Sequence, residues 1–333
     1  MMRPFEYVSP KTQAQAFSLL GSSWGETEIL AGGTDLLALM KEDVARPKRL
    51  VNIKAIGDLH GVQRMKDGSW RMGALTTLGD LAEGPAVQNG LMKEYPAFAE
   101  AVAEAASPQI RSMATLGGNL CQRPRCWYFR NGLGLLPQDE TGKDLVAVGE
   151  NRFHAVLGNE GRAKFVNPST IVPILMAYQA KVQIAGPNGK REVPLEKFFV
   201  IPKTDDEREH DLRPNEIVAA VVLPPARDVK AAHYEIRQKA AFDWPLAVSA
   251  VALKMDGGTI KSARVVLGYV APTPWPSPEA EQALVGKPFN EESAKAAADA
   301  AMKNATPLSQ NAYKVQLAKV SLKRAILKAG GAE

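Results

Sequence analysis

Residues 29–40, ILAGGTDLLALM, place a glycine pair between a short apolar segment and a run whose apolar residues recur at near-helical spacing. This order predicts a strand, a glycine turn and then a helix over residues 35–42. Glycines leave successive backbone N–H groups exposed, and a helix N-terminus adds partial positive charge, which together suit a phosphate group. The turn therefore predicts either a phosphate site or a simple tight turn in which Thr34 or Asp35 caps the helix.

A second glycine pair occurs in residues 110–120, IRSMATLGGNL, where it is followed by Asn119 and preceded by Arg111. Thr76 and Thr77 lie between the two turns in the sequence. Two such turns in one domain could hold both halves of a pyrophosphate. Neither stretch contains G-x-G-x-x-G, and no βαβ unit leads to an acidic residue about twenty positions later, so a Rossmann dinucleotide site is disfavoured.

Positive charge gathers beside the second turn. Residues 109–131 contain Arg111, Arg123, Arg125 and Arg130 and no acid, although the whole chain carries 41 basic against 36 acidic residues, a formal charge of +5. This stretch predicts an anionic ligand or an acidic partner, and the alternative is an ordinary solvated face. Because the other basic residues are interspersed with acids, the composition does not favour nucleic-acid binding.

The length of 333 residues suggests about two domains, and 45% apolar with 23% charged residues is typical of a soluble globular protein. Through the first two thirds, turn residues alternate with apolar runs, which predicts strands mixed with short helices. From about Lys230 we expect three strands and then three alanine-rich helices, at residues 232–237, 247–255, 259–270, 279–285, 291–304 and 308–328. This order predicts a separate α+β domain. Residues 223–229 are the expected boundary, and residues 201–214 an expected surface loop.

Cysteine and histidine usage excludes several classes of site. Cys121 and Cys126 are too few for a disulfide framework or for the four thiolates of an iron-sulfur cluster, and the four histidines are scattered, so no metal site is expected. No window approaches the roughly 18 apolar residues of a membrane span. The N-terminal residues, with Arg3 and Glu6, do not resemble a signal peptide, so a cytoplasmic location is expected.

Three ordered motifs, residues 29–40, residues 72–81 (MGALTTLGDL) and residues 110–120, together resemble one family. The family is that of the FAD-binding medium subunits of molybdenum hydroxylases. It includes flavoprotein subunits of carbon monoxide dehydrogenase, bacterial xanthine dehydrogenase and aldehyde oxidoreductases. The resemblance runs from Phe5 to beyond Leu317 and implies an α+β fold. It implies a two-lobed FAD-binding domain of the vanillyl-alcohol-oxidase (PCMH) type at residues 1–225, with lobes at about 1–58 and 59–225. A C-terminal domain of the carbon monoxide dehydrogenase flavoprotein type, with a three-stranded sheet plus helices, would follow at 230–333.

The resemblance also implies a function and partners. A molybdopterin-containing large subunit would oxidise an aldehyde or N-heterocycle, a 2Fe-2S small subunit would relay electrons, and FAD on this chain would pass them to an external acceptor. The complex would be a heterotrimer or its dimer, periplasmic only if co-exported with a partner that carries a signal peptide. No catalytic residue is expected on this chain, because the redox chemistry belongs to the flavin. Two alternatives are a self-contained flavin oxidoreductase of the same superfamily and a flavin-less scaffold subunit.

Site residues follow from the resemblance position by position. Thr170 stands where the family has the aspartate of a Ser-Asp-x-x-Pro segment, and it cannot supply a charge. Arg237 or Lys239 is the nearest match to a lysine that relatives place near the flavin. The residues implied to contact FAD are Leu30, Ala31, Gly32, Gly33, Thr34, Asp35, Leu36, Thr76, Arg111, Ala114, Thr115, Gly117, Gly118, Asn119, Thr170 and Arg237.

The stretch between Leu120 and Pro168 resembles the loop that carries a 4Fe-4S cluster in some members of the family. Cys126 matches the first ligand position, but the other ligand positions are not cysteine, so we expect the loop without its cluster. Residues 127–129, WYF, could contact the isoalloxazine ring or pack locally. Trp244 is expected to pack in the core or at an interface.

Overall fold

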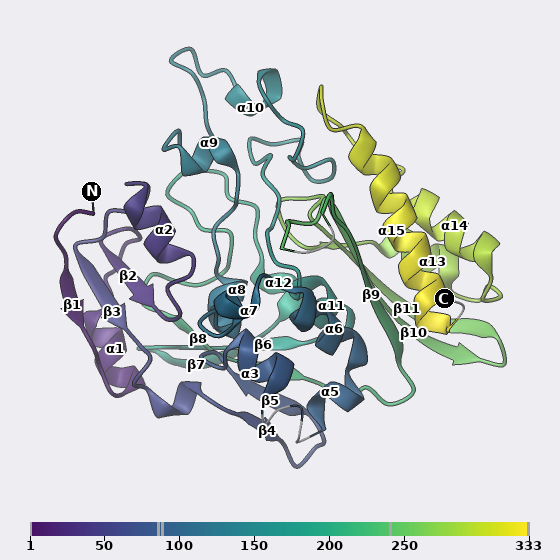
Figure 1. Ribbon diagram of the computed structural model, residues 1–333, viewed down its shortest axis with the longest axis horizontal. Helices are drawn as coiled ribbons and strands as arrows, with labels where there is room; N and C mark the ends of the chain where they lie inside the picture. The colour runs from purple at the N-terminus through teal and green to yellow at the C-terminus, as the bar shows by residue number, and fades with distance from the viewer. Residues whose placement is uncertain (1, 85–86, 88–89, 240–241, 332–333) are drawn as a thin grey trace.

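The computed structural model describes residues 2–84, 87, 90–239 and 242–331 (Figure 1). Figure 1 shows a small N-terminal lobe, a second lobe built around a sheet, a loop-rich segment above them and a C-terminal sheet covered by helices. No helix among the described residues is both long and apolar enough to cross a membrane.

The first lobe is a three-stranded parallel sheet with short helices. Its strands are β1 (Glu6–Val8), β2 (Thr27–Leu30) and β3 (Arg49–Asn52), in the order β1-β3-β2, and its helices are α1 (Gln13–Leu19) and α2 (Leu36–Lys41), followed by a 3-10 turn at Gly57–Leu59. Thr12 caps α1 by accepting a hydrogen bond from the backbone N–H of Gln15. The predicted order of strand, glycine turn and helix is confirmed, because residues 31–35 connect β2 to α2.

The second lobe is a five-stranded antiparallel sheet in the order β4-β5-β8-β6-β7. The strands are β4 (Val62–Arg64), β5 (Trp70–Gly73), β6 (Lys181–Gly186), β7 (Gly189–Pro194) and β8 (Ile217–Leu223). The helices are α3 (Leu78–Glu83), α5 (Leu91–Glu94), α6 (Pro96–Glu104), α7 (Pro108–Arg111), α8 (Leu116–Leu120), α11 (Val172–Ala177) and α12 (Leu195–Phe198). The core contains fully buried Trp70, Phe98 and Phe198. β6 and β7 pair as an antiparallel hairpin.

Residues 121–166, hereafter the arm, rise above both lobes at the top of Figure 1. The arm contains two one-turn helices, α9 (Trp127–Arg130) and α10 (Leu145–Val148), and is otherwise irregular. One part packs on the first lobe, since Phe129, Leu135 and Phe165 share a small buried cluster with Leu39 of α2. Another part bonds to the C-terminal domain, where the N–H groups of Val156 and Leu157 donate to the carbonyl of Val270.

The C-terminal sheet has the order β12-β11-β10-β9. Its strands are β9 (Lys230–Ile236), β10 (Ala247–Asp256), β11 (Thr259–Gly268) and β12 (Trp275–Pro276), and its helices are α13 (Pro278–Leu284), α14 (Glu291–Ala301) and α15 (Tyr313–Gly330). The three predicted strands are confirmed, and β12 adds a two-residue fourth. The last helix begins at Tyr313 rather than at residue 308, because the Asn311 side chain accepts from the N–H of Leu308 and donates to the carbonyls of His154 and Ala155.

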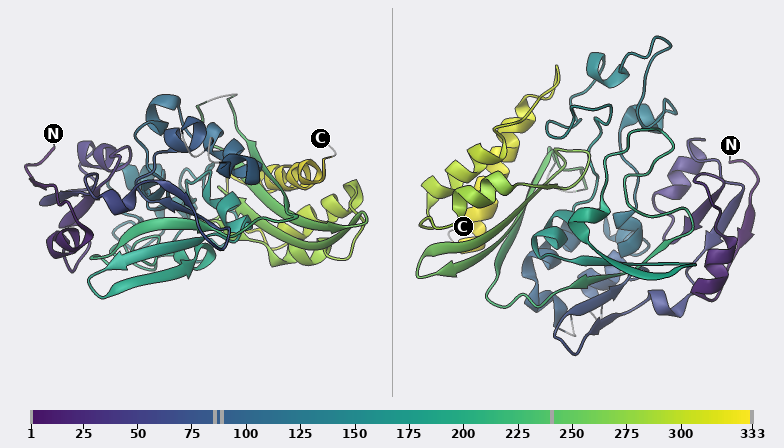
Figure 2. Two further views of the ribbon diagram at one scale, coloured as in Figure 1. Left: turned by 90° about the horizontal axis from the view of Figure 1, so that it is seen from below. Right: turned by 180° about the vertical axis from the view of Figure 1, so that it is seen from behind.

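The C-terminal sheet is buried on both faces. Val251 and Leu253 of β10 pack under α13–α15, whereas Ala250 and Ala252, which point to the opposite face, join the core of the second lobe. Figure 2 shows the three helices on one side of this sheet and the rest of the molecule on the other. The sheet therefore fixes the position of the C-terminal domain relative to the two preceding lobes.

Candidate functional site

A cleft of about 1060 Å³ lies where the first lobe, the second lobe and the arm meet. Twelve of the sixteen predicted site residues line it: Ala31, Gly32, Gly33, Thr34, Asp35, Leu36, Ala114, Thr115, Gly117, Gly118, Asn119 and Thr170. The other four, Leu30, Thr76, Arg111 and Arg237, are not among its lining residues. Both glycine turns thus contribute to one cavity, although about eighty residues separate them in the sequence.

The first turn is held against the second by a close backbone approach. A Cβ atom at position 32 would lie 1.9 Å from the carbonyl oxygen of Met113, so no side chain fits there. Gly33 has φ +75°, a left-handed conformation that glycine adopts without strain. Among the described residues, the backbone N–H groups of Gly32, Gly33 and Thr34 have no acceptor within the protein. They are available to an anionic ligand in the cleft.

The second glycine turn uses three of its N–H groups within the protein. The N–H of Leu116 donates to the carbonyl of Thr76, that of Gly117 to the carbonyl of Ala74, and that of Gly118 to the side chain of Thr115. Gly117 is needed for packing, because its Cβ would lie 2.8 Å from the Cβ of Ala74. Among the described residues, the N–H of Thr115 has no acceptor within the protein, so the second turn leaves this N–H group for a ligand, and its share in holding a pyrophosphate stays a prediction.

Thr76 and Arg111 organise the second lobe instead of lining the cleft. The Thr76 hydroxyl donates to the carbonyl of Gly61 at 3.3 Å. The Arg111 guanidinium is buried and donates to the carbonyls of Ala105 and Ala106 at the end of α6. These groups support the walls of the cleft from behind.

Asp35 is the most densely bonded side chain of the first turn. Its carboxylate does not cap α2. It accepts from the backbone N–H of Arg123 at 2.8 Å, from Nη2 of Arg130 at 2.7 Å and from Nη1 of Arg125. Burial tends to raise the pKa of Asp35, but the Arg125 and Arg130 guanidiniums outweigh it, and the pKa is held below its ordinary value. Asp35 is therefore ionised and ties the first lobe to the arm.

Aromatic and hydroxyl groups form the end of the cleft toward the C-terminal domain. Thr170 lies 3.3 Å from the hydroxyl of Tyr269, which donates to the carbonyl of Pro168. Trp244 is half exposed and lines the cleft, and the Arg125 guanidinium lies 5.0 Å from its ring centroid. The expectation that Trp244 only packs in a core or interface is thereby corrected.

Of the three consecutive aromatics of the arm, Phe129 alone lines the cleft. Trp127 and Tyr128 contact each other, with ring centroids 4.7 Å apart. The Arg123 guanidinium lies 4.8 Å from the Phe129 ring centroid. Local packing is therefore the main role of this aromatic run.

Nothing in the sequence indicated one further part of the cleft lining. Residues 201–214 were expected to be a surface loop, yet Arg208 and His210 line the cavity. Arg208 pairs with Glu28 of β2 at 2.7 Å and lies over the ring of Trp24. No motif marks this cluster, because its members are joined by tertiary contact across about 180 residues.

The two cysteines are free and partly buried. Burial raises the pKa of Cys121 to about 12, and it also raises that of Cys126, whose Sγ lies 3.2 Å from Nε2 of His154. Burial lowers the pKa of His154 to about 4. Both shifts favour a neutral thiol beside a neutral imidazole.

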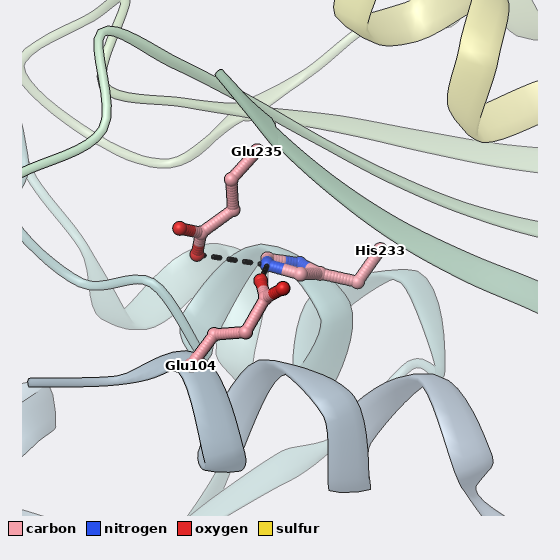
Figure 3. Close-up of side chains that lie close together, drawn as sticks. All are labelled: Glu104, His233 and Glu235. Carbon is pink, nitrogen blue, oxygen red and sulfur yellow. Dashed lines mark hydrogen bonds and ion pairs between the residues drawn. The ribbon is translucent and has the colours of Figure 1, made fainter. Parts of the chain in front are cut away.

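Arg237 lies at the junction between the two domains and not in the cleft. Figure 3 shows His233 of β9 between Glu104 of α6 and Glu235 of β9, with Nε2 at 3.7 Å and 2.9 Å from the two carboxylates. This is the only group of three potential metal-ligating residues in the described part of the chain. Arg237 already bridges both carboxylates, at 3.5 Å and 3.1 Å, so the cluster is an ion-paired contact between domains.

This position leads to a test of the predicted flavin contact. We expect Arg237→Gln to lower the free energy of unfolding by about 2 kcal/mol, because two half-buried or buried carboxylates lose their cation. FAD affinity should stay within about two-fold. Thermal unfolding and FAD titration check this, with Lys239→Gln, whose side chain is exposed, as the control. If Arg237→Gln lost FAD affinity without a loss of stability, the result would support a contact between Arg237 and the flavin and contradict its role at the junction.

Nearly the whole chain is similar to known proteins. The family described as FAD binding domain in molybdopterin dehydrogenase matches residues 3–226, and the family described as CO dehydrogenase flavoprotein C-terminal domain matches residues 232–329. The chain is 32% identical to the aldehyde oxidoreductase FAD-binding subunit PaoB of Escherichia coli, over 96% of each chain. It is 30% identical to the carbon monoxide dehydrogenase medium chain of Hydrogenophaga pseudoflava, over 97% of this chain and 96% of the relative. A solved structure of carbon monoxide dehydrogenase from the same organism contains a chain with a TM-score of 0.77 and 29% identity, covering 100% of this chain and 99% of that one.

Proposed function

We propose, since the chain belongs to the family of FAD-binding subunits of molybdopterin dehydrogenases, that it is the electron-transfer flavoprotein of a multi-subunit molybdenum-dependent hydroxylase. The family makes it an oxidoreductase subunit with FAD as its cofactor. The proposed partners are a molybdopterin-containing large subunit and a 2Fe-2S small subunit. An aldehyde or N-heterocycle would be oxidised on the large subunit, and the electrons would leave this chain for an external acceptor.

The first glycine turn carries this proposal. Its three unpaired N–H groups face a cleft that also has an arginine-bearing wall, and this donor set suits the diphosphate of FAD. The close approach of Gly32 to Met113 leaves no room for a side chain, so the backbone itself forms the cradle. The residues present therefore fit the cofactor that the family implies.

When bound, FAD supplies the redox chemistry, accepting electrons from one partner and giving them to another. The chain's own residues bind and orient it. The turn at residues 31–35 would hold the diphosphate, and Thr170, Trp244 and Phe129 would lie along the remaining cleft wall.

A self-contained oxidoreductase is less well supported. It would need a free acid or base near the flavin. Asp35, the carboxylate beside the first turn, already accepts three hydrogen bonds. Burial raises the pKa of Tyr269 above its ordinary value, so this hydroxyl stays protonated. These groups serve positioning better than proton transfer.

Purification tests the proposal. The chain expressed alone should bind about one FAD per protein, with the visible absorption of a flavin that chemical reductants bleach. Expressed with the neighbouring reading frames, it should co-purify with subunits that contain molybdenum and iron, measured by metal analysis. A chain that binds no flavin would support a scaffold role, and an isolated chain that oxidises an aldehyde by itself would support the self-contained enzyme. Either result would overturn the proposal.

A further inference from the structure

The arm forms the wall of the cleft that faces the first glycine turn. Arg123, Arg125 and Arg130 all line the cavity. Their side chains are largely buried, with exposed fractions of 12%, 28% and 14%. Such burial distinguishes them from a solvated charged face, because guanidiniums are removed from water only where other groups compensate.

Neighbouring acids neutralise only part of this charge. Arg123 pairs with buried Glu209 at 2.9 Å, which leaves no net charge on that pair. Arg125 and Arg130 share the single carboxylate of Asp35. The cluster of Asp35, Arg125 and Arg130 therefore carries a net charge of +1 at the wall of the cleft.

The fixed position of Arg125 indicates that this charge is directed into the cleft. Its guanidinium bonds Asp35 on the first lobe and also lies 5.0 Å from the Trp244 ring, so it reaches from the arm across to the C-terminal side of the cavity. Nη2 of Arg125 is further held by the side chain of Gln122 at 3.1 Å. A planar guanidinium held on several sides is suited to bind phosphate oxygens.

The second glycine turn increases the need for cations. Because the N–H groups of Leu116, Gly117 and Gly118 are bonded within the protein, the first turn supplies more free N–H donors than the second. A diphosphate carries two negative charges, and the ionised carboxylate of Asp35 would repel it. Cations are therefore needed to neutralise the diphosphate and the carboxylate together.

We propose that Arg125 and Arg130 of the arm hold the diphosphate of FAD against the first glycine turn, and that Asp35 positions both guanidiniums. This inference rests on the proposed function and extends its site to residues outside the two glycine motifs. The arm is then part of the cofactor site and not only a loop beside it.

Full-length variants titrated with FAD, followed by flavin fluorescence, test this inference. Arg125→Gln should weaken FAD binding roughly 10- to 100-fold, as expected for loss of a charge-assisted hydrogen bond, and Arg125→Gln with Arg130→Gln should weaken it further. Arg125→Lys, which keeps the charge, should retain most of the affinity. ADP, which carries the diphosphate without the flavin, should lose affinity in the same ratio. Arg152→Gln is the matched control, because Arg152 lies on the arm and pairs with exposed Glu150.

Asp35→Asn separates this role from simple fastening of the arm. If the ion pairs only fasten the arm to α2, Asp35→Asn and Arg125→Gln should damage binding equally. If the arginines hold the diphosphate, Asp35→Asn should weaken FAD binding less than Arg125→Gln does, because both guanidiniums remain and the amide oxygen can still accept from them. An equal loss of FAD affinity in Asp35→Asn and Arg125→Gln would overturn the inference. So would an FAD affinity of Arg125→Gln within two-fold of that of the original chain. Failure of the original chain to bind FAD would overturn the proposed function instead. Should the double variant not fold, the comparison of Arg125→Lys with Arg125→Gln decides the question.

Discussion

Replacing Gly32 by alanine is expected to weaken FAD binding by at least about 100-fold. The added Cβ would lie 1.9 Å from the carbonyl oxygen of Met113 and 2.8 Å from its carbonyl carbon. Both atoms are backbone, so no side-chain rotation relieves the clash, and the two glycine turns must move apart. That movement displaces the free N–H groups of Gly32, Gly33 and Thr34 from the diphosphate site.

FAD titration of a glycine series checks this prediction. Gly33→Ala should have a smaller effect, because its Cβ would meet only the side chains of Leu30 and Leu37, at 3.1 Å or more, although the φ of +75° adds strain. Gly161→Ala is the control, since nothing lies within 4 Å of its Cβ. An affinity of the Gly32→Ala variant within two-fold of the original chain would show that the close approach is not needed for the cofactor.

Replacing Lys314 by methionine is expected to lower the free energy of unfolding by about 3 kcal/mol at pH 10, where folding costs little deprotonation of the buried amine. Lys314 is 1% exposed, and its Nζ donates to the carbonyls of Phe153, His154 and Tyr269 at 3.1, 3.1 and 2.6 Å. Methionine has similar length but no donor. The carbonyls of Phe153 and Tyr269 would therefore lose a hydrogen-bond donor. The arm would lose the side chain that connects it to α15 and to the residue after β11.

The same residue predicts a pH dependence. Burial lowers the pKa of Lys314 from about 10.5 to about 7. Between these values the unfolded chain binds a proton that the folded chain lacks, so stability rises as the pH rises from 7 toward 10, by up to about 1.4 kcal/mol per pH unit. Lys314→Met should abolish this contribution.

Urea unfolding at pH 7, 8, 9 and 10 measures both effects. Lys303→Met, at an exposed lysine, serves as the control and should keep the slope of the original chain. A Lys314→Met variant as stable as the original chain at pH 10, or with the same dependence of stability on pH, would contradict the assigned role.

The local part of the site could be predicted from the sequence because its signals are local. The order of β2, glycine turn and α2 follows from apolar spacing and glycine position, and the structure confirms it. The fold class follows from the three ordered motifs and is confirmed by the matching families and the solved relative. β12 was missed, because its two residues, Trp275 and Pro276, lie in a proline-rich stretch that reads as a turn.

The remaining features depend on contacts between distant residues. The arginine run of residues 109–131 was visible in the sequence, but its target Asp35 lies about ninety residues away. The N–H groups of the second turn looked free, but their acceptors include the carbonyls of Ala74 and Thr76. Arg237 followed the family pattern in sequence, but Glu104 and Glu235 hold it at the junction.

The two-faced C-terminal sheet limits how this protein can be recombined with its relatives. The two matching families meet between residues 226 and 232, which suggests interchangeable modules. Ala250, Ala252 and Val266, however, complete the core of the preceding domain. A C-terminal domain exchanged from a relative would therefore need side chains of matching size at these positions, so a stable chimaera requires compatible residues in both modules.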